Sequence, residues 1–120
     1  MTSKEIGTLA EDKASAYLIH KGYTIITRNF TSRGGEIDII AQDNSNSDNT
    51  LVFIEVKYRA DPSFGWGVEF VTPTKIKRIL KTANYYLYKH HLYDENIRFD
   101  VIQLHGTDFE LTHYENAFGG

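Results

Sequence analysis

Apolar residues recur at helical spacing near the start of the chain. Between Ile6 and Leu18 they fall three or four positions apart, and Gly22 is a suitable stop signal. Thr2 and Glu5 have the spacing of a capping box, in which each side chain satisfies a free backbone donor of the first turn. The pattern therefore predicts an amphipathic helix that begins after Thr2 and ends before Gly22.

Three strand-like segments follow this helix. The first is short and rich in β-branched residues, whereas the second and third alternate between polar and apolar positions. A glycine pair marks a turn between the first two, and a polar, helix-poor segment separates the last two. The predicted strands cover residues 23–27, 36–42 and 51–58, with the turn at 33–35 and the loop at 43–49.

The rest of the chain predicts a second helix and two more strands. Thr72 and Pro73 form a cap followed by proline at the first helical position, and an apolar stripe continues from there to about residue 90. The preceding segment has no period, so a mobile loop is expected at residues 59–71. Strands are expected at residues 97–104 and 109–114, joined by a turn at 106–108.

This order of elements favours one α/β domain that spans residues 1–120, with a mixed central sheet flanked by two helices. The chain has 120 residues, of which 41% are hydrophobic and 24% charged, as in an ordinary globular protein. It has no cysteine, which excludes disulfides, thiolate zinc sites and cysteine nucleophiles. No apolar run approaches the roughly 20 residues of a membrane helix, and the first residues lack a signal peptide's apolar stretch. We therefore expect a cytoplasmic protein without a membrane partner.

Carboxylates on the second predicted strand are the sharpest chemical signal. Strict alternation places Ile37 and Ile39 on one face and Glu36 and Asp38 on the other. If the 43–49 loop closes symmetrically, Asp38 lies opposite a second carboxylate, that of Glu55. Like charges directly opposite each other destabilise a sheet.

A divalent cation would resolve this conflict, because Mg²⁺ is commonly held by one or two carboxylates together with waters and a substrate phosphate. The same register places Glu36 opposite Lys57, so an ammonium group would stand beside the bound ion. The alternative interpretation is a solvated hairpin face, which is where most alternating charges belong.

These residues also carry a family resemblance. Asp38, followed on the next strand by Glu55 and Lys57, resembles the PD-(D/E)xK nuclease signature, with Ile37 in place of the proline. The wider sequence resembles the YraN-like family, often described as distant relatives of archaeal Holliday junction resolvases. The matching positions are Gly7, Ala10-Glu11, Gly22-Tyr23, Arg28-Asn29-Phe30, Gly35 to Asp38, Phe53 to Lys57, Arg59, Phe64-Gly65, Lys75, Arg98-Phe99-Asp100 and Asn116-Ala117-Phe118.

The resemblance implies a restriction endonuclease-like fold and metal-dependent hydrolysis of phosphodiester bonds in DNA, with branched DNA among the candidate substrates. Asp38, Glu55 and Glu11 would hold Mg²⁺ or Mn²⁺, and Lys57 would orient the attacking water and stabilise charge on the phosphate. All four would then be catalytic, with Glu36 as a partner of Lys57 or a support behind the ligands. A homodimer is compatible with this interpretation.

The second predicted helix carries positive charge on the side away from its apolar stripe. Lysine and arginine with interleaved tyrosines suit a phosphate backbone and, where strands open, base stacking. Against this, the net charge is −3 and gives no global attraction to nucleic acid, and a solvated helix face explains the pattern equally well. A non-cleaving nucleic-acid-binding module and a protein-interaction domain also stay open. The candidate nucleic-acid-binding residues are Lys75, Lys77, Arg78 and Lys81.

Overall fold

The structure is a computed structural model that describes residues 1–45, 47–60 and 71–119. Seven helices and strands lie in these residues. They follow the predicted order of helix, three strands, helix and two strands. The loop expected at residues 59–71 lies mostly outside the described residues. The elements are α1 (Ser3–His20), β1 (Tyr23–Ser32), β2 (Gly35–Asp43), β3 (Thr50–Arg59), α2 (Pro73–Lys89), β4 (Ile97–His105) and β5 (Glu110–Tyr114).

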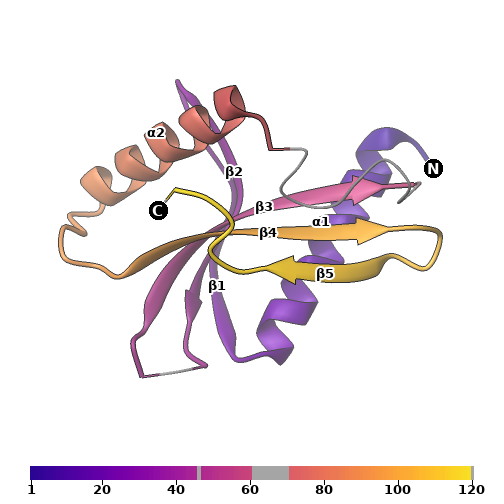
Figure 1. Cartoon of the computed structure of the whole chain (residues 1–120), viewed down its shortest axis with the longest axis horizontal. Helices are drawn as coiled ribbons and strands as arrows, with labels where there is room; N and C mark the ends of the chain where they lie inside the picture. The colour runs from indigo at the N-terminus through magenta and orange to yellow at the C-terminus, as the bar shows by residue number, and fades with distance from the viewer. Residues whose placement is uncertain (46, 61–70, 120) are drawn as a thin grey trace.

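The five described strands form one sheet in the order β1-β2-β3-β4-β5 (Figure 1). Neighbouring strands are antiparallel except β3 and β4, which run parallel and are connected in sequence through α2. The sheet is therefore mixed and flanked by two helices, which confirms the predicted fold class. Neither α1 nor α2 is long and apolar enough to cross a membrane.

Both helix starts are capped as predicted. At α1, the Glu5 N–H donates to Thr2 Oγ1 at 3.1 Å and the Thr2 N–H donates to Glu5 Oε1 at 3.0 Å. At α2, Thr72 Oγ1 accepts a hydrogen bond of 3.2 Å from the Lys75 N–H, and Pro73 occupies the first helical position. These caps fix where each helix begins, and the second one fixes the position of Lys75.

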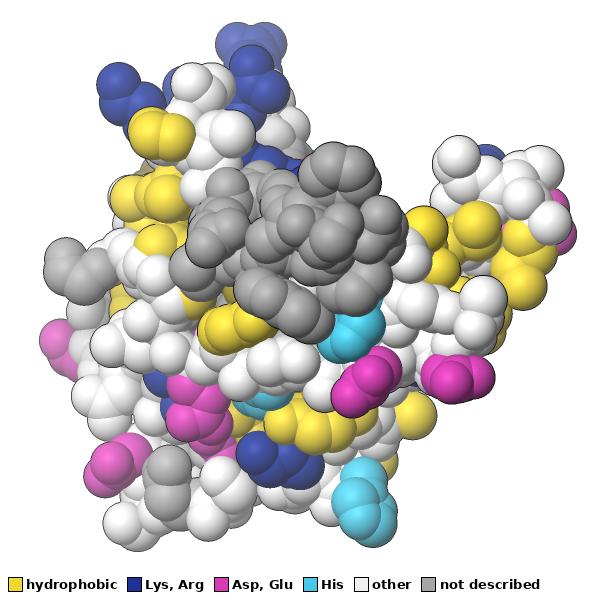
Figure 2. Space-filling view, turned by 45° about the vertical axis from the view of Figure 1, so that its right-hand side comes forward, with side chains coloured by type: hydrophobic (Ala, Val, Ile, Leu, Met, Phe, Trp, Pro, Cys, Tyr) yellow, Lys and Arg dark blue, Asp and Glu magenta, His cyan; other side chains and the backbone are white. Residues whose placement is uncertain are grey.

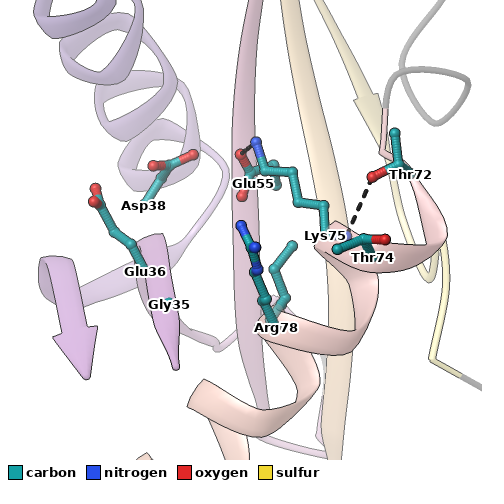
Figure 3. A pocket seen from close by; sticks show the side chains of 9 residues that line it. Gly35, Glu36, Asp38, Glu55, Thr72, Thr74, Lys75 and Arg78 are labelled. Carbon is teal, nitrogen blue, oxygen red and sulfur yellow. Dashed lines mark hydrogen bonds and ion pairs between the residues drawn. The ribbon is translucent and has the colours of Figure 1, made fainter. Parts of the chain in front are cut away.

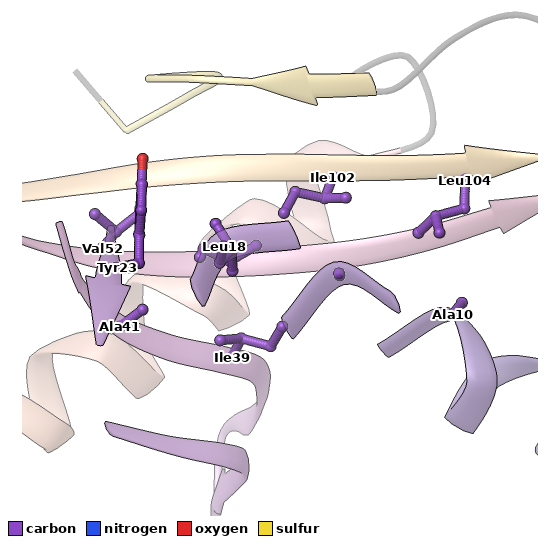
Figure 4. Packing of buried hydrophobic residues seen from close by; sticks show 10 residues of the cluster. Ala10, Leu18, Tyr23, Ile39, Ala41, Val52, Ile102 and Leu104 are labelled. Atoms are coloured by element: carbon purple, nitrogen blue, oxygen red, sulfur yellow. The ribbon is translucent and has the colours of Figure 1, made fainter. Parts of the chain in front are cut away.

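The core has two parts, one on each face of the sheet. On one face, Ala10 and Leu18 of α1 pack against strand residues such as Ile39 (Figure 4). On the other face, Ile79 of α2 packs against strand residues such as Phe53. All of these side chains are almost fully buried, and each contributes roughly 1.5–3 kcal/mol by leaving water, alanine excepted.

β1 is longer than the strand predicted at residues 23–27. It pairs with β2 as far as the contact between Ser32 and Gly35. The residues after Thr27 are polar apart from Phe30, so their own pattern gives little strand signal. The extension therefore depends on pairing with β2, which a propensity-based prediction does not include.

The alternation predicted for β2 breaks at Asp38. Ile39 belongs to the core under α1, whereas Ile37 belongs to the core under α2, although strict alternation would place both on one face. Asn29, which lies between the β1 partners of these two residues, has a left-handed φ of 55°. The expectation of strict alternation is therefore wrong at Asp38. On the β3 side of this residue the ladder ends at the Ile39–Ile54 pair, and on the β1 side Asn29 has a left-handed backbone.

A buried ionic cluster surrounds Arg98 at the start of β4. Its guanidinium donates to Asp100 at 2.9 Å, to Asp43 at 3.1 Å and to the Tyr23 hydroxyl at 2.7 Å. His113 lies 2.7 Å from the second oxygen of Asp100. Burial alone would raise the pKa of Asp100, but hydrogen bonds from His113 and Arg98 outweigh it and hold that pKa below its usual range.

We expect Arg98→Met to destabilise the fold strongly, because it leaves two buried carboxylates, Asp43 and Asp100, without their cation. The free energy of unfolding should fall by about 3–5 kcal/mol, the usual cost of removing one partner of a buried pair. Urea denaturation measures this, with Lys77→Met at an exposed position as the control. A loss for Arg98→Met no larger than that of the control would contradict the prediction.

Candidate functional site

A cavity of about 470 Å³ lies between β2, β3 and the first turns of α2. We call it the acidic cavity. Figure 3 shows Glu36 and Asp38 on one side of it, Glu55 on β3, and Lys75 and Arg78 entering from α2. Its lining consists of Gly35, Glu36, Asp38, Glu55, Thr72, Thr74, Lys75, Arg78 and Ile79.

Asp38 is held by the backbone of the next strand. Its Oδ2 accepts a hydrogen bond of 2.8 Å from the Val56 N–H, so a side chain occupies the place where the β2–β3 ladder would continue. Burial and the nearby charge of Glu55 raise the pKa of Asp38 to about 8, against the lowering effect of the Val56 N–H. The Asp38 carboxyl therefore lacks the compensation that an ionised group needs away from water.

Glu55 is compensated by two lysines. It is buried, with 6% of its surface exposed, and its Oε1 lies 2.7 Å from Lys75 Nζ and 3.7 Å from Lys57 Nζ. Burial and the neighbouring Lys75 lower the pKa of Lys57. Burial also opposes the charge of Lys75, but its hydrogen bond with Glu55 outweighs this and raises the Lys75 pKa. Glu55 and Lys75 thus form the tighter ion pair.

The predicted strand register is confirmed, with one difference at its end. β2 and β3 pair from Asp43–Thr50 to Ile39–Ile54, as symmetric closure of the loop requires. The ladder stops there, so Asp38 and Glu55 converge on the cavity without forming a regular cross-strand pair. The predicted pairing of Glu36 with Lys57 differs in the same way. Among the described residues, Lys57 forms its ion pair with Glu55, and Glu36 lines the cavity.

Glu11 lies close enough to Asp38 for its charge to contribute to the raised pKa of that residue. Its own partner is Arg28 of β1, whose Nε lies 3.3 Å from Glu11 Oε1, and it does not line the acidic cavity. Within residues 1–45, 47–60 and 71–119, no three His, Cys, Asp or Glu side chains form a group that could hold a metal ion. The structure therefore brings together Asp38 and Glu55, with Glu11 beside them.

The four candidate nucleic-acid-binding residues of α2 divide into two groups. Lys75 and Arg78 line the acidic cavity, whereas Lys77 and Lys81 line an adjoining hollow together with Arg78. Sequence reasoning missed Thr74 as a lining residue. The cap at Thr72 could have indicated Thr74, because Thr74 lies in the first turn of α2, at the helix end that borders the cavity.

We expect Asp38→Asn to stabilise the metal-free protein, increasingly so as the pH rises. A carboxyl whose folded pKa is raised stabilises the fold fully below its unfolded pKa, near 4, and loses that contribution as the pH rises through about 8. Asparagine is neutral throughout and can still accept from the Val56 N–H.

The advantage of Asp38→Asn in EDTA should therefore grow by at least about 1.4 kcal/mol between pH 5 and pH 9, the equivalent of one pKa unit. Denaturant melts at both pH values measure it, with the exposed Asp108→Asn as the matched control. Equal pH dependence in the two variants would mean that Asp38 is an ordinary solvated carboxylate.

Comparisons with known proteins identify the family. The sequence profile of the Uncharacterised protein family UPF0102 matches residues 10–104. The chain is 42% identical to a UPF0102 protein of Clostridium novyi, over 97% of each chain. It is 43% identical to one of Fusobacterium nucleatum, over 92% of this chain and 89% of the relative. These matches confirm the YraN-like resemblance at family level, and the chain belongs to the Uncharacterised protein family UPF0102.

Proposed function

We propose that this protein is a divalent-cation-dependent nuclease that hydrolyses phosphodiester bonds in DNA. The observation that carries the proposal is the acidic cavity, where Asp38 and Glu55 converge and lysines contact Glu55. Phosphodiester hydrolysis needs a hard cation, a positioned water and stabilisation of developing negative charge, and this combination of groups suits all three. The resemblance to the PD-(D/E)xK signature supports the same chemistry.

The cavity offers the donors that Mg²⁺ or Mn²⁺ prefers. Mg²⁺ is commonly held by one or two carboxylates, with waters and substrate phosphates completing its shell, so Asp38 and Glu55 fit without a third protein ligand. The raised pKa of Asp38 means that ionising this carboxyl is unfavourable in the cavity, and a bound cation would offset that cost. When bound, the cation would supply Lewis-acid activation of the scissile phosphate and of the attacking water.

The neighbouring side chains then take distinct roles. Lys57, beside Glu55, can orient the attacking water and stabilise charge that develops on the phosphate oxygens. Lys75 holds Glu55 in place through the 2.7 Å ion pair. Arg78, on the cavity wall, can bind a non-bridging phosphate oxygen through its guanidinium. Glu11 acts on Asp38 through its charge, and it would act on the reacting centre through a water or a second ion.

A nucleic-acid-binding module that does not cleave is the second candidate. Two observations favour it. Lys75 already occupies a carboxylate oxygen that an ion would use, and the described ranges contain no group of three metal-ligating side chains. Both candidates bind nucleic acid, so metal-dependent cleavage is the property that separates them.

Purified protein should cleave at least one of three DNA substrates, namely linear duplex, single-stranded or four-way-junction DNA, when Mg²⁺ or Mn²⁺ is present. Asp38→Ala and Lys57→Ala should each lower the rate by about a hundredfold or more, whereas Lys4→Ala on the exposed start of α1 should not. Circular dichroism checks that the variants are folded. Cleavage that persists in the Asp38 or Lys57 variant would assign the activity to a contaminant or to another site.

Metal binding should also be visible in stability, without any substrate. A cation that binds only the folded state raises the free energy of unfolding by about 2.7 kcal/mol at a hundredfold excess over its dissociation constant. We therefore expect Mn²⁺ to raise the melting temperature of the wild type, and to raise that of Asp38→Asn much less. Asp108→Asn should respond like the wild type. A wild type without a metal-dependent shift, confirmed by calorimetry, would leave only the fold and the binding candidate.

A further inference from the structure

A groove continues from the acidic cavity along α2. Three adjoining hollows share lining residues with the acidic cavity or with one another, and they run between α2 and the turn that joins β1 to β2. Figure 2 shows Lys and Arg side chains gathered at the top of the molecule, where Figure 1 places this turn and the start of α2. We call this series of hollows the α2 groove. Its cationic and aromatic lining side chains include Arg33, Arg78, Lys81, Tyr85 and Lys89.

Close packing forms the groove without any ligand. A Cβ on Gly34 would come within 3.1 Å of the Lys81 side chain, and one on Gly35 within 3.1 Å of Thr82 Oγ1. The Ser32 and Thr82 hydroxyls lie 3.4 Å apart, so a hydrogen bond joins the turn to the helix. A side chain at either position would crowd α2, so the two glycines favour this close approach of the turn, which forms one wall of the groove.

The far end of the groove contains an aromatic platform. Tyr85 is 45% exposed and stacks on Phe30, with ring centroids 6.2 Å apart and an interplanar angle of 27°. It lines a cavity of about 290 Å³ together with Arg33, Lys81 and Lys89. An aromatic ring held from behind and flanked by cations is the combination that binds an unpaired base and its adjoining phosphates.

The spacing connects this platform to the acidic cavity. Lys75 and Tyr85 are ten residues apart on one helix, which corresponds to about 15 Å along its axis. At about 3.4 Å per nucleotide, the axial spacing along one strand of duplex DNA, this distance spans roughly four nucleotides, and fewer where the strand is extended. A base inside an intact duplex keeps its face stacked on its neighbours, so the platform suits a base from an unpaired segment.

We propose that the cavity at Tyr85 is a nucleobase site that takes an unpaired base of a single strand, whose phosphates follow α2 to the acidic cavity. This inference rests on the proposed nuclease activity for its chemistry. It implies that the substrate carries a single-stranded segment beside the scissile bond. Tyr85 provides the stacking surface, and Lys81, Lys89 and Arg33 contact the backbone. Binding at Tyr85 needs no metal and precedes any cleavage.

Fluorescence anisotropy in EDTA tests this site with a labelled oligothymidylate and a matched strand of abasic sites. Tyr85→Ala should weaken binding of the oligothymidylate by between about fivefold and 150-fold, because one stacked base is worth about 1–3 kcal/mol. The abasic strand should bind both proteins equally, and Tyr85→Trp should restore the loss. Tyr93→Ala, an exposed tyrosine outside the groove, is the matched control and should bind like the wild type.

The double variant Lys81→Ala with Lys89→Ala should weaken both strands alike and reduce the salt slope by about 1.4, the contribution of two phosphate contacts on a single strand. The nucleobase site is overturned if Tyr85→Ala binds oligothymidylate as the wild type does, or if it weakens the abasic strand equally. Metal-dependent cleavage alongside either result would leave the nuclease intact and remove only this site. Base-dependent binding at Tyr85 without cleavage of any DNA would retain the nucleobase site and overturn the proposed nuclease activity.

Discussion

Withdrawing two carboxylates from water in the same cavity costs free energy unless each one gains a compensating group. Glu55 gains two lysines, and the closer one, Lys75, comes from the first turn of α2. Among the described residues, Asp38 accepts a backbone hydrogen bond from the Val56 N–H, while burial and the charge of Glu55 raise its pKa. The cap at Thr72, the docking of α2 and the end of the β2–β3 ladder all serve this arrangement, because moving any of them would separate a carboxylate from its partner.

Much of this arrangement could be predicted from the sequence, because it depends on local patterns. Turn residues and alternation gave the element order and the β2–β3 register, and that register alone brought Asp38 toward Glu55. The break in alternation at Asp38 could not be predicted in this way. It depends on a side chain of one strand bonding the backbone of the next, and on a left-handed residue, Asn29, in the strand on the other side.

Contacts between distant elements account for the rest of what the sequence left open. Lys75 was expected to face nucleic acid, but its position relative to Glu55 depends on how deeply α2 packs on the sheet. Glu11 was assigned to the site by resemblance alone, and the docking of α1 leaves it paired with Arg28 while its charge still reaches Asp38. Helix periodicity identifies which face is apolar, but it does not fix the distance from a helix residue to a strand residue.

The chain contains a second group of buried carboxylates, and the contrast between the two groups bears directly on function. Around Arg98, the carboxylates of Asp43 and Asp100 have low pKa values, because a guanidinium and several hydrogen bonds hold them. The Asp38 carboxyl has a raised pKa in the same fold. A chain that compensates one buried cluster fully has the means to compensate the other. Among the described residues, the carboxyl with a raised pKa, Asp38, lies in an open cavity beside a groove rich in cations. This is the pattern expected where a ligand completes the charge balance. The net charge of −3 does not oppose this, since the groove's cations and the cavity's carboxylates act locally on whatever binds there.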